Sequence, residues 1–343
     1  MEKVDIKSFT EEQLRGYIET IGEKSFRGSQ VFKWIYKGIK DFDDMNNIPA
    51  PLRQKLAQNA YIDNIQIDKK LVSKIDQTRK YLFRLMDGNI IESVMMKYKH
   101  GVSACISTQV GCRMGCSFCA STVDGMERNL TASEMLDQII GIQEDTGERV
   151  SNVVMMGSGE PLDNFEETVK FLRAVNDKNG LNIGYRHITL STCGIVPKIY
   201  DLADMEIPIN LAISLHAVDD TSRKRIMPIA KAYSIEEVLD ACRYYVEKTN
   251  RRITFEYAII QGVNDSEKEA LALSKLLKGI LSHVNIIPVN KIDEKDYKRP
   301  SKEGVERFSG ILSKHGINAT VRREMGSDIN GACGQLRKRN ISG

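Results

Sequence analysis

The sequence predicts an α/β fold in which six strand–helix units form a partial (β/α)6 barrel, preceded by a small helical domain and a β extension. The first observation is that six apolar segments recur with helical stretches between them. Continuous apolar strands that alternate with helices are typical of a parallel sheet covered by helices. The second is that six units are too few for a complete eightfold barrel, so we expect an open barrel with its binding site at the C-terminal ends of the strands. The expected strands lie near residues 103–107, 151–156, 187–191, 209–215, 253–260 and 284–289.

Helix starts between these strands carry a recurring spacing signal. In a capping box, a Ser, Thr or Asp caps the helix and a Glu or Gln three residues later bonds back to it. We therefore expect helices to begin at Thr131 with Glu134, Asp163 with Glu166, Ser234 with Glu237 and Ser266 with Glu269.

The first hundred residues follow different patterns. Residues 1–60 favour short helices, because Thr10 with Gln13 has capping-box spacing and later apolar residues recur at helical intervals. Residues 61–100 favour strands. The chain is therefore expected to divide into an N-terminal helical domain (1–60), a strand-rich connecting extension (61–100) and a partial barrel with a C-terminal loop (101–343).

Length and composition limit the class of protein. A chain of 343 residues, 41% of them hydrophobic, is long and apolar enough for one large domain and a smaller one. No segment approaches the ~18 uninterrupted apolar residues of a membrane helix, and the charged start of the chain lacks a signal region. Seven cysteines, three of them within eight positions, do not suit a secreted disulfide framework. We expect a cytoplasmic, soluble protein without membrane contact and, since nothing indicates an obligate oligomer, a monomer.

The net charge of +3 is unevenly distributed. Residues 1–100 carry a balance of +4, residues 101–290 a balance of −6 and residues 291–343 a balance of +5, which includes the run Arg337-Lys338-Arg339. Two basic ends could hold a polyanion such as RNA. Solvated surface charge explains the same pattern, so charge alone leaves both interpretations open.

Three cysteines directly after the first barrel strand form the strongest motif. Cys112, Cys116 and Cys119 lie on one short loop with Gly111 and Gly115. Their thiolates can hold a [4Fe–4S] cluster and leave one iron without a protein ligand. That iron can bind the amino and carboxylate groups of S-adenosylmethionine (SAM), whose reductive cleavage yields a 5′-deoxyadenosyl radical. A structural zinc site would need a fourth Cys or His that the local sequence lacks, and inert cysteines would not explain the clustering.

Polar groups follow four of the other expected strands. Each group alone is a weak signal, because Gly-x-Gly is common in turns and a lone histidine is more often structural. Together, at the same end of successive parallel strands, they indicate a ligand-binding rim. Glycines there would let the main chain approach a ligand, and Glu160 could accept a hydrogen bond from an ammonium group. The four groups are Gly157-Ser158-Gly159-Glu160, Ser191-Thr192-Cys193-Gly194, Ser214-Leu215-His216 and Val289-Asn290.

Three thiols and one carboxylate remain to be explained. Cys333 lies in a Gly-rich segment without a core pattern, where it is either a reactive thiol or an accidental one. Glu92 shares one face of an expected strand with apolar residues, so its carboxylate is either salt-bridged or placed for proton transfer. Cys105 lies in the first barrel strand, seven residues before the cluster motif, and Cys242 has the spacing of a core helix residue.

The cysteine motif after the first strand of a βα domain resembles that of the radical SAM superfamily. Further segments resemble the RlmN family, the dual-specificity RNA adenine-C2 methyltransferases of bacteria. They are Cys105–Cys112, Met156–Leu162, Leu211–Ala217, Asp328–Gln335 and, near the N-terminus, Phe26–Tyr36. Ser158 stands in place of an expected methionine, and we expect no effect of this departure on the chemistry.

This resemblance implies a mechanism and assigns residues to it. A first SAM methylates the thiol of Cys333, and a radical made from a second SAM takes a hydrogen atom from that methyl group. The resulting carbon radical adds to C2 of adenine, Glu92 accepts the C2 proton, and Cys105 attacks the sulfur of Cys333, which releases the RNA and leaves a disulfide. By the same resemblance the cluster is bound by Cys112, Cys116 and Cys119, and SAM by Gly159, Glu160, Ser191, Ser214, Leu215, His216 and Asn290.

The resemblance also implies partners. The substrates are an adenine of 23S rRNA in the peptidyl-transferase centre and the adenine 3′ of the anticodon in certain tRNAs. Such a base must be unstacked to reach a buried cluster. Residues 1–60 become an RNA-binding domain, and an electron donor such as flavodoxin or ferredoxin supplies the cluster.

Three other functions compete with this one. The sister group that methylates C8 of the same rRNA adenine, and gives antibiotic resistance, shares the cluster, the fold and both reactive cysteines, but the run Glu160-Pro161-Leu162 favours the C2 group. A radical SAM methylthiotransferase would need more cysteines before Cys112, where only Cys105 precedes it. A non-catalytic iron–sulfur electron carrier would not need six βα units, a ligand rim or a loop thiol.

Overall fold

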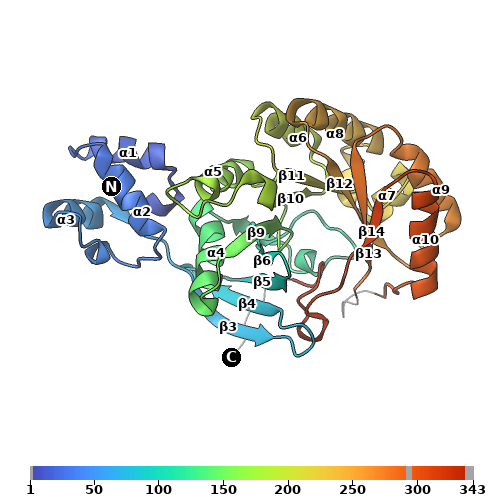
Figure 1. Cartoon of the computed structure of the whole chain (residues 1–343), viewed down its shortest axis with the longest axis horizontal. Coiled ribbons are helices and arrows are strands. Elements are labelled where there is room, and N and C mark those ends of the chain that lie inside the picture. Colours follow the sequence, from blue (N-terminus) through green and yellow to red (C-terminus); the bar gives the residue numbers. More distant parts are fainter. Residues whose placement is uncertain (1–2, 291–295, 337–343) are drawn as a thin grey trace.

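The structure, a computed structural model, describes residues 3–290 and 296–336, so the basic run Arg337-Lys338-Arg339 lies outside the described residues. One ten-stranded mixed sheet forms the centre of the molecule (Figure 1). From one edge to the other its strands are β14 (Ala319–Val321), β13 (Ser282–Pro288), β12 (Ile253–Ile259), β11 (Asn210–Ser214), β10 (Ile188–Thr192), β9 (Val150–Met155), β6 (Gly101–Cys105), β5 (Ile90–Tyr98), β4 (Arg79–Arg84) and β3 (Gln66–Val72).

The strand pairing confirms the expected open α/β barrel. The six expected strands are β6, β9, β10, β11, β12 and β13, and all of them pair in parallel. A seventh parallel strand, β14, pairs with β13 and was not expected from the sequence. On the other side β5, β4 and β3 continue the same sheet in antiparallel pairing. Among the described residues β14 and β3 are the two edges of the sheet, so the barrel is not closed.

Helices between the parallel strands cover the outer face of the sheet. They are α4 (Ala132–Thr146), α5 (Phe165–Asn176), α6 (Val196–Asp204), α7 (Asp220–Ile226), α8 (Ile235–Thr249), α9 (Glu267–Leu276) and α10 (Lys302–Lys314). The predicted capping boxes at Thr131, Ser234 and Ser266 are confirmed. The predicted cap at Asp163 is wrong, because α5 follows Asn164 and has no side-chain cap. The carboxylate of Asp163 instead pairs with Arg113 and accepts a hydrogen bond from Gln109.

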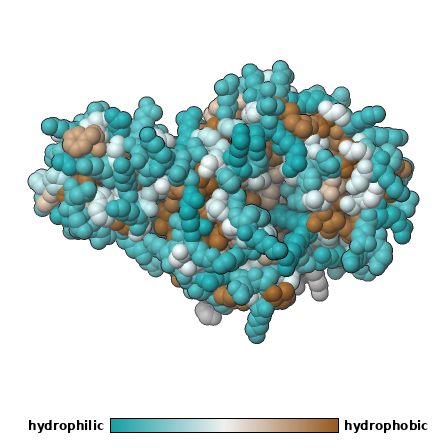
Figure 2. Space-filling model, viewed as in Figure 1, coloured by the Kyte–Doolittle hydropathy of each residue, from teal (hydrophilic) through white to brown (hydrophobic). Residues whose placement is uncertain are grey.

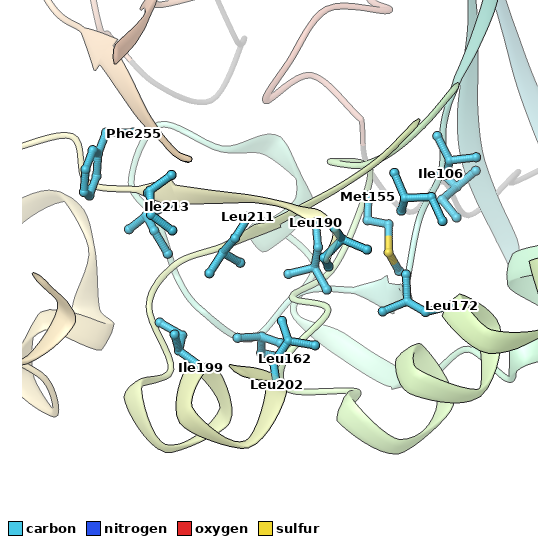
Figure 3. Packing of buried hydrophobic residues seen from close by; sticks show 14 of the residues in the cluster. Ile106, Met155, Leu162, Leu172, Leu190, Ile199, Leu202, Leu211, Ile213 and Phe255 are labelled. Atoms are coloured by element: carbon cyan, nitrogen blue, oxygen red, sulfur yellow. The ribbon is translucent and has the colours of Figure 1, made fainter. Parts of the chain in front are cut away.

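The main hydrophobic core lies between this outer face and the helices. Figure 3 shows Met155, Leu190 and Leu211 from successive strands facing Leu172 and Leu202 of the helices. Each such side chain contributes on the order of 1.5–3 kcal/mol when it leaves water. Cys242 is fully buried in the same core, which confirms its predicted packing role. The inner face of the sheet is therefore left for the polar groups at the strand ends.

The N-terminal segment has a hydrophobic core of its own. Its helices are α1 (Glu11–Thr20), α2 (Phe26–Ile35) and α3 (Ala50–Asn59), and the parallel pair β1 (Val4–Asp5) and β2 (Ala60–Tyr61) brings its two ends together. The capping box at Thr10 is confirmed. Figure 2 shows this lobe set off by a notch from the rest of the molecule, with mostly hydrophilic side chains on the visible face.

Two further features bear on the expected organisation. The strands of residues 61–100 are part of the central sheet. We therefore propose that this extension is a distinct stretch of the sequence but not a separate structural unit. Among the helices that the structure describes, none is both long and apolar enough to cross a membrane.

Candidate active site

The loop that carries the three motif cysteines is held by a small hairpin. Strand β7 (Gln109–Gly111) pairs antiparallel with β8 (Met126–Asn129), and the loop runs between them. Gly111 has a φ of +78°, and a Cβ atom there would lie 1.8 Å from the main-chain oxygen of Gly125. Only glycine fits this position. The turn that follows is closed by a hydrogen bond from the N–H of Cys119 to the oxygen of Cys116 (3.2 Å).

Contacts from distant parts of the chain fix the same loop. Arg113 forms an ion pair with Asp163, beyond β9. The N–H of Ser117 donates to the oxygen of Ile226 (2.9 Å), and the N–H of Ala120 donates to the oxygen of Gly334 (2.8 Å). The last contact joins the motif loop to the segment that carries Cys333.

The three cysteines face a cavity at the C-terminal ends of the parallel strands, here called the cluster cavity. Its volume is about 960 Å³ when counted out to its opening to solvent. The predicted rim meets in this cavity, with the exception of Leu215, whose side chain is fully buried in the main core. The site residues predicted from the sequence that line it are Cys112, Cys116, Cys119, Gly159, Glu160, Ser191, Ser214, His216, Asn290 and Cys333.

The donor set of the cluster cavity fits an iron–sulfur cluster. The described residues contain no group of three His, Cys, Asp or Glu side chains close enough for a single metal ion. The corners of a cluster can bind thiolates that lie further apart. Burial raises the pKa of the thiols of Cys112 and Cys116, and a bound metal would favour their thiolate forms. These three thiols could therefore hold the cluster, and the rim beside them could hold SAM.

Glu160 lies at the base of this cavity and joins two strand ends. Its Oε2 accepts a hydrogen bond from the N–H of Cys193 (2.7 Å), and its Oε1 accepts one from the N–H of Leu162 (3.0 Å). Burial raises the pKa of this carboxyl, against these hydrogen bonds. Gly159 before it has a φ of +108° and comes so close to Gln109 that a Cβ atom would lie 2.7 Å from that main-chain nitrogen.

His216 is a neutral hydrogen-bond donor in this site. Its Nδ1 accepts from the N–H of Ala258 (2.8 Å), which leaves the ring proton on Nε2. Burial, and then the charge of Arg223, lowers the pKa of this imidazole to about 3. The ring stands edge-on to Phe118 of the motif loop, with the ring centres 4.8 Å apart.

A second, smaller cavity adjoins the first and is here called the thiol cavity. Cys105 and Cys333 both line it, and Cys333 also lines the cluster cavity. The Nδ2 of Asn290 donates to the main-chain oxygen of Cys333 (2.9 Å). Cys333 is thus the thiol that lies between the cluster site and Cys105.

Arg322 lines the thiol cavity together with Cys105 and Cys333. Burial, with the thiol of Cys333 next, raises the pKa of Cys105 to about 12, while Arg322 opposes the rise. Arg322 lines both cavities and lies 4.0 Å from the carboxylate of Glu256. Interaction with Cys333, and then with Glu256, raises the pKa of this guanidinium. Arg322 therefore places a cation beside both thiols.

Glu92 is on the expected strand, but its carboxylate does not reach either cavity. It is completely buried in β5 and forms an ion pair of 2.8 Å with Lys80, also buried. It lies on the face of β5 that also carries Val94, which pairs with Cys105 across β6. Of the two interpretations of this carboxylate, the structure directly shows the salt bridge.

Three charged residues of the site were missed in the sequence. Arg322 follows β14, and a strand-end search would have found it had that short strand been recognised. Arg223 of α7 is completely buried and donates to the main-chain oxygens of Cys193 (2.7 Å) and Ser214 (3.2 Å), which ties the ends of β10 and β11 together. Lys80 gave no local signal, because a lysine in an alternating strand usually faces solvent.

Comparison with known proteins places these features in two families. A model described as the Radical SAM superfamily matches residues 106–273. A model described as the ribosomal RNA large subunit methyltransferase N-terminal domain matches residues 4–62. The first match includes the motif cysteines and most of the parallel strands, and the second covers the helical lobe.

Relatives match almost the whole chain. The "Probable dual-specificity RNA methyltransferase RlmN" of Clostridioides difficile (strain 630) is 65% identical over 337 residues, with 98% of each chain covered. The protein of the same name from Alkaliphilus oremlandii (strain OhILAs) is 62% identical over 341 residues, with 99% of each chain covered. The crystal structure of a radical SAM methyltransferase from Sphaerobacter thermophilus superposes with a TM-score of 0.92 at 42% identity, covering 97% of this chain and 99% of that one.

Proposed function

The chain belongs to the RlmN family of dual-specificity RNA methyltransferases within the radical SAM superfamily, and from this premise we propose that it methylates C2 of adenine in RNA. The proposed substrates are an adenine of 23S rRNA in the peptidyl-transferase centre and the adenine 3′ of the anticodon in certain tRNAs. The proposed site of action is the cytoplasm, where both RNAs occur. Residues 1–60 are the proposed RNA-binding domain, and a flavodoxin or ferredoxin is the proposed electron donor.

Membership of the radical SAM superfamily implies an iron–sulfur cluster and SAM. We assign a [4Fe–4S] cluster to Cys112, Cys116 and Cys119, and SAM to the rim of the cluster cavity. When bound, these groups would supply the one-electron chemistry that forms a carbon radical. His216 offers the Nε2 proton to a ligand in the cavity, and Asn290 orients the main chain of Cys333.

Cys333 is the proposed carrier of the methyl group. Its thiolate attacks the methyl carbon of a first SAM in an ordinary polar reaction, S-adenosylhomocysteine leaves, and the transferred carbon later becomes bonded to C2 of adenine. Cys105 then attacks the sulfur of Cys333, a disulfide forms, and the bond from that sulfur to carbon breaks. The electron pair of the broken bond stays with the carbon, which takes up a proton and becomes the methyl group of the product. A reductant must then reopen the disulfide.

The observation that supports this assignment most strongly is that Cys333 lines both cavities. A thiol that receives a group at the cluster site and is then attacked by a second thiol must be reachable from both sides. Cys105 lines only the thiol cavity, as the attacking thiol requires. An electron carrier would have no use for this arrangement.

Glu92 is the proposed acceptor of the C2 proton. It lies on the same sheet face as the partner of Cys105, and its ionised form is balanced by Lys80. Because its carboxylate is buried in the structure, this role requires the adenine to enter through the thiol cavity as far as β5. That requirement makes the role of Glu92 a separate, testable part of the proposal.

The proposal is tested by product analysis. The cluster is reconstituted without oxygen, and SAM, a reductant and an unmodified 23S rRNA fragment are added. Nucleosides from the digested RNA are then compared by mass spectrometry with standards of 2-methyladenosine and 8-methyladenosine. We expect 2-methyladenosine from the unmodified enzyme and none from Cys333→Ala. A product of 8-methyladenosine would assign the chain to the C8 reaction, and cleavage of SAM without any methyladenosine would overturn the proposed substrate.

A further inference from the structure

Lys80 links the proposed proton acceptor to the segment that carries Cys333. Its Nζ lies 2.8 Å from Oε2 of Glu92 and donates a hydrogen bond of 3.0 Å to the main-chain oxygen of Asn330. The side chain of Lys80 is 1% exposed and that of Glu92 is 0% exposed. One ammonium group therefore contacts both a carboxylate on β5 and the main chain three residues before Cys333.

The register of the sheet places Lys80, Val94 and Cys105 in one row across three strands. Lys80 pairs with Val94 across β4 and β5, and Val94 pairs with Cys105 across β5 and β6. Because cross-strand partners share a face, Lys80, Val94 and Cys105 point to the same side of the sheet. Met325 and Leu336 belong to the same buried hydrophobic cluster as Val94 and Cys105. The segment between Met325 and Leu336 thus packs against the row at both of its ends.

The hairpin between β3 and β4 holds the same segment at a second place. The N–H of Gly326 donates to Oδ2 of Asp76 (3.0 Å), and the N–H of Lys74 donates to Oδ2 of Asp328 (2.9 Å). Asp76 belongs to the hairpin and Asp328 to the Cys333 segment. Each segment thus uses a carboxylate to accept a hydrogen bond from the main chain of the other. With the bond from Lys80, three hydrogen bonds join residues 74–80 to residues 326–330.

We propose that Lys80 is a positioning residue. It holds the Cys333 segment over Cys105, and it fixes the position of the Glu92 carboxylate relative to Cys105 and Cys333. The inference rests on the proposed function for the role of Glu92, but the placement of Cys333 relative to Cys105 does not depend on it. Lysine suits the task because its ammonium group has three donors and a full charge. It balances the buried carboxylate while it also bonds to a main-chain oxygen.

A second buried lysine provides a matched control. Lys7 forms an ion pair of 2.5 Å with Asp137, and its Nζ donates to the main-chain oxygen of Asp63 (2.8 Å). The side chains of this pair are 2% and 6% exposed. Lys7→Met therefore removes the same two kinds of contact, an ion pair to α4 and a hydrogen bond to the main chain of Asp63, and any general effect of breaking a buried ion pair appears in both variants.

The first experiment measures the approach of the two thiols without RNA. Reconstituted holoenzyme is treated anaerobically with diamide, which accepts two electrons and two protons as Cys105 and Cys333 form a disulfide. Peptide mapping by mass spectrometry follows that disulfide over time. We expect Lys80→Met to slow it on the order of 10- to 100-fold, because small displacements of reacting groups have effects of this size. Lys80→Arg is expected to recover most of the rate, and Lys7→Met to leave it unchanged.

The second experiment separates steps of the proposed reaction. Methylation of Cys333 by SAM does not involve Glu92, whereas release of the RNA from the covalent adduct does. We expect Lys80→Met to form S-methylcysteine but to release RNA more slowly than the unmodified enzyme does, with recovery in Lys80→Arg. Thermal unfolding of each variant reports on the fold.

The outcomes of the two experiments are distinct. The inference is overturned if Lys80→Met forms the disulfide at the unmodified rate, or if Lys7→Met slows it as much. Failure of the unmodified enzyme to methylate RNA, with a disulfide rate that still depends on Lys80, would instead overturn the proposed function and leave the positioning role supported.

Discussion

Asn290, at the end of β13, donates a hydrogen bond of 2.9 Å from Nδ2 to the main-chain oxygen of Cys333. This contact joins the last expected barrel strand to a thiol 43 residues later in the chain. Asn290 was predicted as a SAM contact from resemblance, and its observed partner is the segment that carries Cys333, the proposed acceptor of the methyl group. Asn290 can therefore act on the first methyl transfer through Cys333 itself.

Replacement of Asn290 by Ala tests this contact. A single hydrogen bond contributes about 1 kcal/mol, so we expect methylation of Cys333 to slow by about 5- to 10-fold at saturating SAM. Intact-protein mass spectrometry measures the rate. Asn176→Ala is a matched control, because Nδ2 of Asn176 donates to the main-chain oxygen of Ile183 (3.2 Å) away from both cavities. An unchanged rate in Asn290→Ala would show that this bond does not position the thiol.

Gly111 provides a test of the motif loop that does not touch a cysteine. In Gly111→Ala the new Cβ would lie 1.8 Å from the main-chain oxygen of Gly125, which cannot move without opening the pair of β7 and β8. Gly262 has a similar φ of +71° but open space around its Cβ position, so Gly262→Ala carries only the backbone strain of about 1–2 kcal/mol.

The comparison of the two glycine variants isolates the clash. We expect Gly111→Ala to lose bound iron after reconstitution and to unfold at a lower temperature than Gly262→Ala. Iron analysis and thermal unfolding monitored by circular dichroism give the two measurements. Equal iron content in the two variants would mean that the loop tolerates the displacement.

The parallel strands were predictable because each is a run of apolar residues between helix signals. Strand β14 was missed because it has three residues, Ala319-Thr320-Val321, and two of them are exposed. Arg322 was not predicted for the same reason, because its position beside Cys333 depends on that strand. Short edge strands form through pairing with a neighbour rather than through their own pattern, and a single sequence does not display that neighbour.

Predictions from local spacing also fail where a side chain bonds to a group that is distant in the sequence. Asp163 has the spacing of a helix cap, but Arg113 and Gln109 take its carboxylate. Lys80 resembles a solvent-facing strand residue, yet the Cys333 segment, some 250 residues away in the chain, buries it. The motif cysteines and the strand-end residues could be singled out from the sequence because their signal is local. The relation of Cys333 to the two cavities is tertiary, and only resemblance indicated it.

The cysteines themselves allow a direct test of the cluster assignment. We expect Cys112→Ala, Cys116→Ala and Cys119→Ala each to lose most of the bound iron, because each removes one thiolate ligand. Cys242 is a buried thiol of the main core, so Cys242→Ala serves as the control for cysteine loss, whereas Cys193→Ala tests a further thiol that lines the cluster cavity. Iron and sulfide analysis of each reconstituted variant is the measurement. Loss of iron from Cys193→Ala equal to that of the motif variants would require a different ligand set.

The raised pKa of Asp63, which lies where the helical lobe meets α4, predicts that the free energy of unfolding depends on pH. Burial raises the pKa of this carboxyl to about 7, with smaller contributions from Glu134 and two aspartates, against its usual value of 3.8. Its Oδ2 accepts one hydrogen bond, from Ser133 (3.2 Å), and no cation pairs with it among the described residues. The folded protein therefore binds this proton more tightly than the unfolded chain does.

The sign of the effect follows from that difference in proton binding. The stabilisation is fully present below about pH 4 and is lost as the pH rises to about 7, so it corresponds to a fall on the order of 2–4 kcal/mol. Asp63→Asn keeps a neutral side chain at every pH, so its free energy of unfolding is expected to lack this fall and to exceed that of the unmodified protein above pH 7. Urea unfolding of both proteins between pH 4 and 8 measures the difference, with the exposed Asp43→Asn as control. Parallel curves for Asp63→Asn and the unmodified protein would mean that Asp63 is already ionised in the folded state.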